Sequence, residues 1–302
     1  NEYSTLSRKC KQHFNIHKAL KIACLLVVLM RCFSPSEAQI PPSNPNKTDA
    51  DGLRQGPWTI WFNAQWKVTS HTDSIAYYRL INYQDNLPVD TVRDYYTSGA
   101  LQMKGIMIND RPEEKLHGKI RFFAENGHLT GDGLYDSGEW VVRHAYDSLG
   151  KINPQTHVNN ALNLRKKGMD SLAIHYFQRA RPFVLNNYQP DLIAVFYSLY
   201  GLSFEALNQS DSAIWMFKKS IEYYESLPPK KLTSSYVTLL RKLATHHKSL
   251  DQFQEELPYR EKIVRYEDPQ RVESYLLSQN NLAVVYIHTK AYSKAQRLYR
   301  NI

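Results

Sequence analysis

Cysteine and histidine, the side chains that most often act as nucleophiles or metal ligands, are poorly placed for chemistry in this chain of 302 residues. The cysteines are Cys10, Cys24 and Cys32. No residue beyond position 32 can therefore form a disulfide, a thiolate–metal bond or a cysteine nucleophile. His246 and His247 are adjacent. Neighbouring side chains on a helix point about 100° apart, so this pair does not converge on one metal ion. We expect His247 to fill the core instead.

The common catalytic and nucleotide-binding motifs are also missing from the sequence. It contains no phosphate loop, GxGxxG, HExxH or GxSxG. Asp49-Ala50-Asp51-Gly52 has the start of a calcium loop but lacks the later ligands, and Gly131-Asp132-Gly133 is typical of a turn. No Asp or Glu pair has the pattern of a general acid and base. We therefore expect no catalytic residue, no cofactor and no metal ion, which predicts that the chain is not an enzyme.

A helical pattern begins after Asn153 and repeats pairs of mostly small residues twelve positions apart. Two antiparallel helices need small residues where their axes approach closely, and a large residue beside them fills the groove. A large residue follows four positions after the second member of each pair. The pairs are Ala161/Ala173, Gly201/Ala213, Ala244/Glu256 and Ala283/Ala295, and the large residues are Phe177, Phe217, Arg260 and Tyr299. This spacing predicts stacked helical hairpins, with a departure at the third repeat.

The arrangement resembles the tetratricopeptide repeat (TPR), in the longer form found in kinesin light chain. The segment from Asn280 to Tyr286 looks like the first helix of that subfamily. The resemblance implies a superhelix in which the first helix of each hairpin lines a concave groove. Long polar side chains there can hold an extended peptide, although they are equally explained as exposed helix residues. The residues expected to face the groove are Arg165, Glu205, Arg241, Lys248, Asn280 and His288.

Residues 56–152 contain short aromatic runs separated by Gly, Asn and Asp, a pattern typical of β-hairpins. The expected strands are Trp58–Phe62, Ile75–Tyr83, Val92–Tyr96, Leu101–Ile108, Lys119–Ala124 and Trp140–Tyr146. Glycines between them supply positive φ angles in tight turns. The segment resembles degenerate MORN repeats, which implies a single-layer meander without catalysis. We therefore predict an α+β multidomain fold, with an N-terminal antiparallel β-hairpin (MORN-like) meander followed by an all-α tetratricopeptide-repeat superhelix over residues 153–302.

Residues 1–38 have the features of a secretory signal peptide. Lys18 and Lys21 precede an apolar run, and small residues lead to a cleavage site after Ala38. The run, Ile22 to Met30, is too short to span about 30 Å of hydrocarbon, and its other interpretation is a buried core helix. Residues 39–55 read as a proline-containing linker. We expect an exported protein (periplasmic, cell-surface or secreted) without a membrane span after signal removal, and a fragment of a longer product.

The basic residues are concentrated in the helical half, where residues 153–302 hold twenty Lys or Arg against thirteen Asp or Glu. This balance favours an acidic partner, or is simply a solvated helical surface. Tyrosines at helix-packing spacing and the export signal argue against nucleic-acid binding. We predict a protein–protein interaction scaffold that binds a protein or peptide ligand, with an acidic ligand as one expectation.

An alternative function follows from a second resemblance. A signal peptide, MORN-like repeats and long tetratricopeptide repeats together resemble the front half of bacterial CHAT-domain proteins, which end in a caspase-like peptidase. Such a domain needs a catalytic cysteine, and no cysteine follows Cys32. In this alternative the chain is the regulatory or sensor part of a larger peptidase or signalling enzyme, and the catalytic domain lies beyond Ile302.

Overall fold

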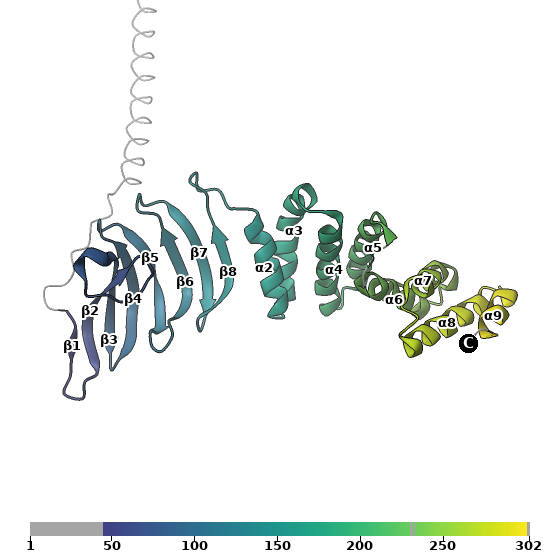
Figure 1. Cartoon of the computed structure of the whole chain (residues 1–302), viewed down its shortest axis with the longest axis horizontal. Helices are drawn as coiled ribbons and strands as arrows, with labels where there is room; N and C mark the ends of the chain where they lie inside the picture. Colours follow the sequence, from purple (N-terminus) through teal and green to yellow (C-terminus); the bar gives the residue numbers. More distant parts are fainter. Residues whose placement is uncertain (1–44, 230–231, 233, 301–302) are drawn as a thin grey trace, which may run out of the picture. The chain divides into compact units, whose positions relative to one another are not determined.

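Strands and then helices follow one another along the chain in the computed structural model (Figure 1), which describes residues 45–229, 232 and 234–300. The signal peptide expected over residues 1–38 lies outside the described residues, as does the start of the expected linker. Eight strands form one sheet in sequence order, with antiparallel pairing from β1 to β7. The strands are β1 (Lys47–Thr48), β2 (Arg54–Asn63), β3 (Ile75–Gln84), β4 (Leu87–Tyr96), β5 (Leu101–Asn109), β6 (Lys115–Phe123), β7 (Leu129–Asp136) and β8 (Glu139–Ala145).

The core of the sheet is built from alternate residues, which share one face of a strand. Val92, Met107 and Ile120 are among its most buried members. Glycine makes room for these side chains at one close approach. A Cβ added to Gly105 would lie 2.2 Å from Cδ1 of Ile120, so a larger residue at this position would force Ile120 to move.

Strand β7 was not among the expected strands, and the prediction of a turn at Gly131-Asp132-Gly133 is wrong. Gly131 lies opposite Phe122 in the register of β6 and β7, and Gly133 lies opposite Ile120. The absence of two side chains leaves space for the large residues across the strand pair. Glycine has a low propensity for β-strands, so Gly131 and Gly133 are also the reason why this strand was not predicted.

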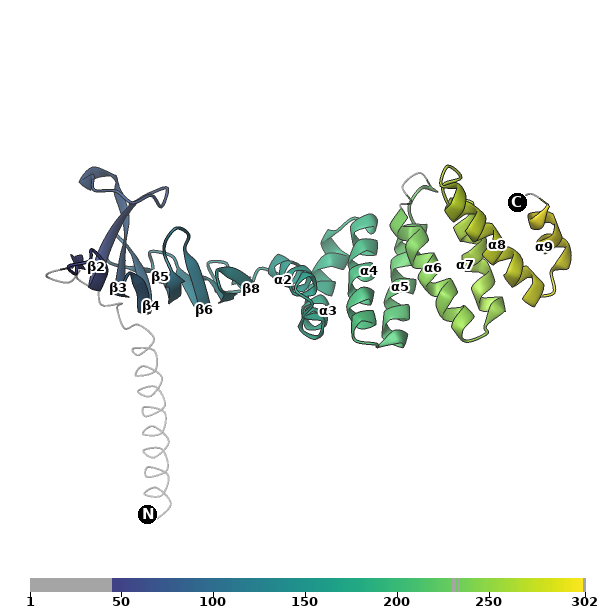
Figure 2. The ribbon, with the colours of Figure 1, turned by 90° about the horizontal axis from the view of Figure 1, so that it is seen from below.

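Eight helices follow the sheet within the described chain and pack as antiparallel hairpins, as Figure 2 shows for α4 and α5. The first helices of the hairpins are α2 (Gln155–Lys166), α4 (Pro190–Ala206), α6 (Ser234–Ser249) and α8 (Val272–His288). The second helices are α3 (Asp170–Asn187), α5 (Ser210–Glu225), α7 (Phe253–Tyr266) and α9 (Tyr292–Tyr299).

The four pairs of residues twelve positions apart are all buried, as the predicted hairpins require. The closest packing is at Gly201 in α4. A Cβ added there would lie 2.5 Å from Cε1 of Phe217 and 3.2 Å from the backbone oxygen of Ala213. The helices of this hairpin therefore approach so closely that Gly201 has no room for a side chain, which confirms the prediction of helical hairpins.

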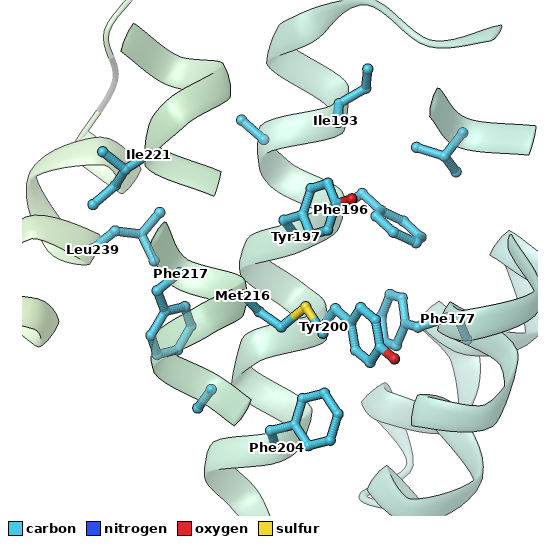
Figure 3. Packing of buried hydrophobic residues seen from close by; sticks show 14 of the residues in the cluster. Phe177, Ile193, Phe196, Tyr197, Tyr200, Phe204, Met216, Phe217, Ile221 and Leu239 are labelled. Carbon is cyan, nitrogen blue, oxygen red and sulfur yellow. The ribbon is translucent and has the colours of Figure 1, made fainter. Parts of the chain in front are cut away.

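Aromatic side chains join the first two hairpins. Figure 3 shows the ring of Tyr200 pointing toward Phe177, and the two rings stack with their centroids 5.1 Å apart. Phe196 meets Phe177 edge-on at 5.3 Å. Burying such rings is the main source of stability in an interface of this kind. The same residues therefore fix how α4 packs against α3.

The third hairpin replaces the usual small and aromatic residues by an ion pair. Glu256 is fully buried, and Nε of Arg260, one turn later, donates to its Oε1 at 2.7 Å. Pro258 lies inside α7, which continues to Tyr266. His247 is buried as expected, with its ring stacked on Tyr259.

The predicted fold class is wrong, because the helices do not form an all-α domain. The described chain divides into two units, and the unit that holds the helices also contains residues Val141–Asp147, which include most of β8. Asn160 of α2 is fully buried, accepts a hydrogen bond from the backbone N–H of Arg143 at 2.9 Å and donates one to its carbonyl at 2.7 Å. The amide thus pairs with an extended backbone as a neighbouring strand would. The fold is α+β: eight strands in sequence order are followed by helical hairpins, and α2 of the first hairpin pairs with β8 through Asn160.

Candidate functional site

Two adjoining pockets open between the second and third helical hairpins. One has a volume of about 440 Å³ and is lined by residues of α4, α5 and α6. The other, of about 300 Å³, is lined by the same three helices. They share Thr238 and Lys242, so they form one continuous depression, which we call the α4–α6 trough.

The α4 wall of the trough is mainly apolar, although Ser198 and Glu205 also line it. Val195, Leu199 and Leu202 line it, and the exposed Leu192 continues the series toward the start of the helix. These residues follow one another at intervals of three or four, so they share one face of α4. Val195 is 42% exposed and Leu192 50%, although the opposite face of α4 is buried in the core. A helix that is apolar on two faces is normally covered on both, so this stripe indicates a contact surface.

The α6 wall carries hydroxyl groups instead. Ser234, Ser235 and Thr238 line one pocket, and Thr238 and Thr245 line the other. The hydroxyl of Thr238 donates to the backbone oxygen of Ser234 at 3.0 Å, which leaves its lone pairs able to accept. The floor is formed by α5, with apolar residues such as Ile214 and Phe217. The α4 wall of the trough is therefore mainly apolar, and the α6 wall is mainly polar.

The basic side chains that line the trough already have acidic partners. Nζ of Lys242 donates to both carboxylate oxygens of Glu205, at 2.8 and 2.7 Å, and lies 5.7 Å from the ring centre of Phe217. Arg241 donates to the buried carboxylate of Glu267 and, at 3.1 Å, to Oγ of Ser274. Each cation in these two pairs is matched by one anion, so the pairs leave little net charge in the trough.

His246 lies at the end of the trough nearest the C-terminus of α6. Burial lowers the pKa of His246 below its ordinary value, and the neighbouring His247 acts in the same direction. The neutral imidazole, in which one ring nitrogen donates and the other accepts, is therefore the main form at pH 7.

Two of the six residues predicted to face a groove line the trough, namely Glu205 and Arg241. Arg165 instead pairs with Asp170 at 3.1 Å within its own hairpin. The remaining three are exposed and line neither pocket of the trough: Lys248, Asn280 and His288, whose ring stacks on Phe253 at 3.9 Å.

The residues that shape the trough, above all Val195, Leu199 and Leu202, were not predicted from the sequence. Only long polar side chains of the first helices were expected to face a groove and hold a peptide backbone. The signal that was present is the second apolar stripe on α4, at intervals of three and four residues.

Other chemistry has little support in the described chain. No three His, Cys, Asp or Glu side chains among the described residues lie close enough to hold a metal ion. No helix of residues 45–300, as far as they are described, is long and apolar enough to cross a membrane. In the sheet, Arg79 is buried between Asp94, at 2.7 Å, and Glu114, at 2.5 Å. The ion pair of Arg79 with Asp94 joins residues that lie opposite each other in β3 and β4, so its role is to hold these strands in register.

Comparison with known proteins adds structural neighbours but no family. No protein-family model and no curated protein matches the sequence. A crystal structure of BtubC (BKLC) from P. vanneervenii is 20% identical, with a TM-score of 0.35, and the match covers 48% of this chain and 59% of that one. A putative kinesin light chain with TPR-like repeats from Podosopora anserina is 17% identical (TM-score 0.35, 49% and 72% covered). A structure of MamA is 14% identical (TM-score 0.33, 49% and 75% covered).

All three TM-scores are below 0.5, so the fold of the helical unit is assigned from its own packing. The buried small residues, the interlocked Gly201 and Phe217, and the aromatic contacts between hairpins identify it as a set of TPR-like helical hairpins.

Proposed function

We propose that this protein is a non-enzymatic interaction scaffold, which binds a protein or peptide partner in the α4–α6 trough. The observation that carries the proposal is the apolar stripe on α4, which lines a depression of about 300 Å³ and includes the exposed Val195. An apolar surface of this kind is usually covered by a partner. Stacked helical hairpins supply the rigid support that a binding surface needs.

A peptide selection on the whole chain tests this proposal. A phage-displayed library of random 16-residue peptides would be selected on the immobilised protein, and enriched peptides measured by fluorescence anisotropy. In Val195→Asp a carboxylate replaces an apolar contact, which weakens binding at least about tenfold. The matched control is Leu185→Asp on α3, since Leu185 is 38% exposed and lies outside the trough. We expect it to bind within about twofold of the wild type, a difference below 0.5 kcal/mol.

Two results would contradict the proposal. The first is a selection from which no peptide is enriched above background. The second is a set of enriched peptides that bind Val195→Asp and Leu185→Asp equally well, because the binding surface would then lie elsewhere. Circular dichroism of both variants shows whether they are folded, as we expect for substitutions at exposed helix positions.

Three further expectations come from the sequence and are tested separately. We propose that the protein is exported, which a fusion of residues 1–45 to an export-dependent reporter enzyme would test. The acidic ligand expected from the basic helical half competes with the near-neutral ligand argued below, and it would give selected peptides rich in Asp and Glu. The regulatory role in a CHAT-type peptidase requires a downstream domain with a catalytic Cys/His pair, which sequencing the gene beyond the codon for Ile302 would reveal.

A further inference from the structure

The two walls of the α4–α6 trough differ in chemistry, and the difference specifies its partner. We propose that the trough binds an amphipathic α-helix of near-neutral charge. Apolar side chains of this helix lie against α4, and its small polar side chains (Ser, Thr, Asn or Gln) lie against α6. The inference rests on the proposed function and names the class of partner for the same site.

The shape of the α4 wall fits a helix. The stripe from Leu192 to Leu202 extends over about 15 Å, at 1.5 Å of rise per residue. Side chains at intervals of three and four residues form ridges, and a second helix packs its own ridges between them. About three turns of a partner helix would cover the stripe, with anchors at positions i, i+3 or i+4, and i+7.

The depression between the walls also has the right form. Residues of α5 lie between α4 and α6 as its floor, including Ile214 and Phe217. The two pockets continue into each other at Thr238 and Lys242. The apolar floor residues line one pocket and the apolar α4 residues line the other, so a ligand that runs along the trough meets the two apolar regions one after the other.

The charges of the trough argue against an acidic ligand. A ligand carboxylate close to Lys242 would also lie close to the Glu205 carboxylate that binds Nζ, and the repulsion between the two anions offsets the attraction to Lys242. To reach Arg241, the ligand carboxylate would compete with Glu267, whose side chain is 6% exposed and also accepts from the hydroxyl of Ser278 at 3.2 Å. Separating Arg241 from a buried carboxylate would leave that anion without its countercharge, which is costly. A partner without net charge leaves both pairs intact.

The hydroxyl wall sets the side of the helix that faces α6. Thr238 uses its proton in the bond to Ser234, so it offers an acceptor to the ligand. An amide side chain, Asn or Gln, donates to such an acceptor. A purely apolar ligand face would cover the lone pairs of the Thr238 hydroxyl without a donor to replace water, which lowers affinity.

The peptides selected on the whole chain also test this inference. We expect enriched sequences to carry apolar residues at i, i+3 or i+4, and i+7, with a net charge close to zero. Circular dichroism should show that they gain helix on binding. Their Kd should change less than about threefold between 50 and 500 mM NaCl, since salt screens charge pairs but not apolar contacts. Thr238→Val, which keeps the shape and removes the hydroxyl, should weaken peptides that carry Asn or Gln by about three- to tenfold.

The outcomes separate this inference from the function on which it rests. Peptides that are acidic and lose affinity steeply with salt, while still sensitive to Val195→Asp, would overturn the helix proposal and leave the scaffold function standing. Peptides that bind in extended form would do the same. Peptides insensitive to Val195→Asp, or a selection without enriched peptides, would overturn both.

Discussion

Substitution of Gly201 tests the packing of the helical hairpins most sharply. In Gly201→Ala the new Cβ would lie 2.5 Å from Cε1 and 2.6 Å from Cδ1 of Phe217, far inside van der Waals contact. Overpacking of this kind costs about 1–3 kcal/mol. Alanine gains about 1 kcal/mol over glycine from helix propensity, which offsets part of the cost. We therefore expect a net loss of about 0–2 kcal/mol in the free energy of unfolding.

The assay is urea denaturation of the whole chain, followed by circular dichroism at 222 nm, which reports mainly the helices. A double-mutant cycle with Phe217→Leu locates the cause. Phe217→Leu alone destabilises, since it removes buried apolar volume, but it relieves the clash made by Gly201→Ala. We expect the double variant to be more stable than the sum of the single effects by at least about 1 kcal/mol. If Gly201→Ala instead stabilises the protein, or the two effects simply add, then Gly201 and Phe217 do not meet and the assigned hairpin is wrong.

Three further substitutions probe other parts of the helical unit. Asn160→Ala removes the partner of the backbone N–H and carbonyl of Arg143. We expect a loss of about 2–4 kcal/mol in the free energy of unfolding in urea, and faster hydrogen exchange at the Arg143 amide. Unchanged exchange at this amide would refute the contact. Glu256→Ala removes one partner of a buried ion pair and should lower the free energy of unfolding by about 3–5 kcal/mol. The double variant with Arg260→Met should regain much of this stability, because no unpaired charge is left in the core. Equal losses in the single and the double variant would show that the pair is not buried. Burial and neighbouring cationic side chains lower the pKa of His157 below its ordinary 6.5, so its contribution to stability is present above that pH and is lost as the pH falls through the lowered value. The Tm should therefore fall below pH 6.5, and less so in His157→Phe; the same pH dependence in both proteins would assign the effect to other groups.

The helical hairpins could be predicted because their signal is local. Close approach of two helices demands small residues at fixed spacing, and Gly201 and Ala213 show that demand in the sequence itself. The buried pair of Glu256 and Arg260 follows no such rule. It replaces a small–aromatic contact by a charge pair, which only the structure reveals.

The junction between strand and helix could not be predicted, because it depends on one long-range contact. Asn160 has the sequence context of an ordinary helical residue, yet its amide pairs with the backbone of Arg143. Strand β7 was not predicted for a related reason. Its glycines lie opposite large side chains of β6, and this pairing between strands is visible only in the structure.

The candidate site was predicted in part. Glu205 and Arg241 lie in the trough, but each is neutralised by a partner 37 or 26 residues away, which a search for polar side chains does not anticipate. The apolar residues Val195 and Leu202 were visible in the sequence, although a helix with two apolar faces does not show which one the core covers.

Photo-crosslinking gives the most direct measurement of where a partner binds. The residue p-benzoylphenylalanine would replace Thr238 in the trough or, as the control, Leu185 on α3, and each protein would be irradiated with a peptide selected on the wild-type chain. We predict a covalent adduct from position 238, competed by unlabelled peptide, and none from position 185. Adducts from position 185 alone, or equally from both positions, would show that the partner does not lie between α4 and α6.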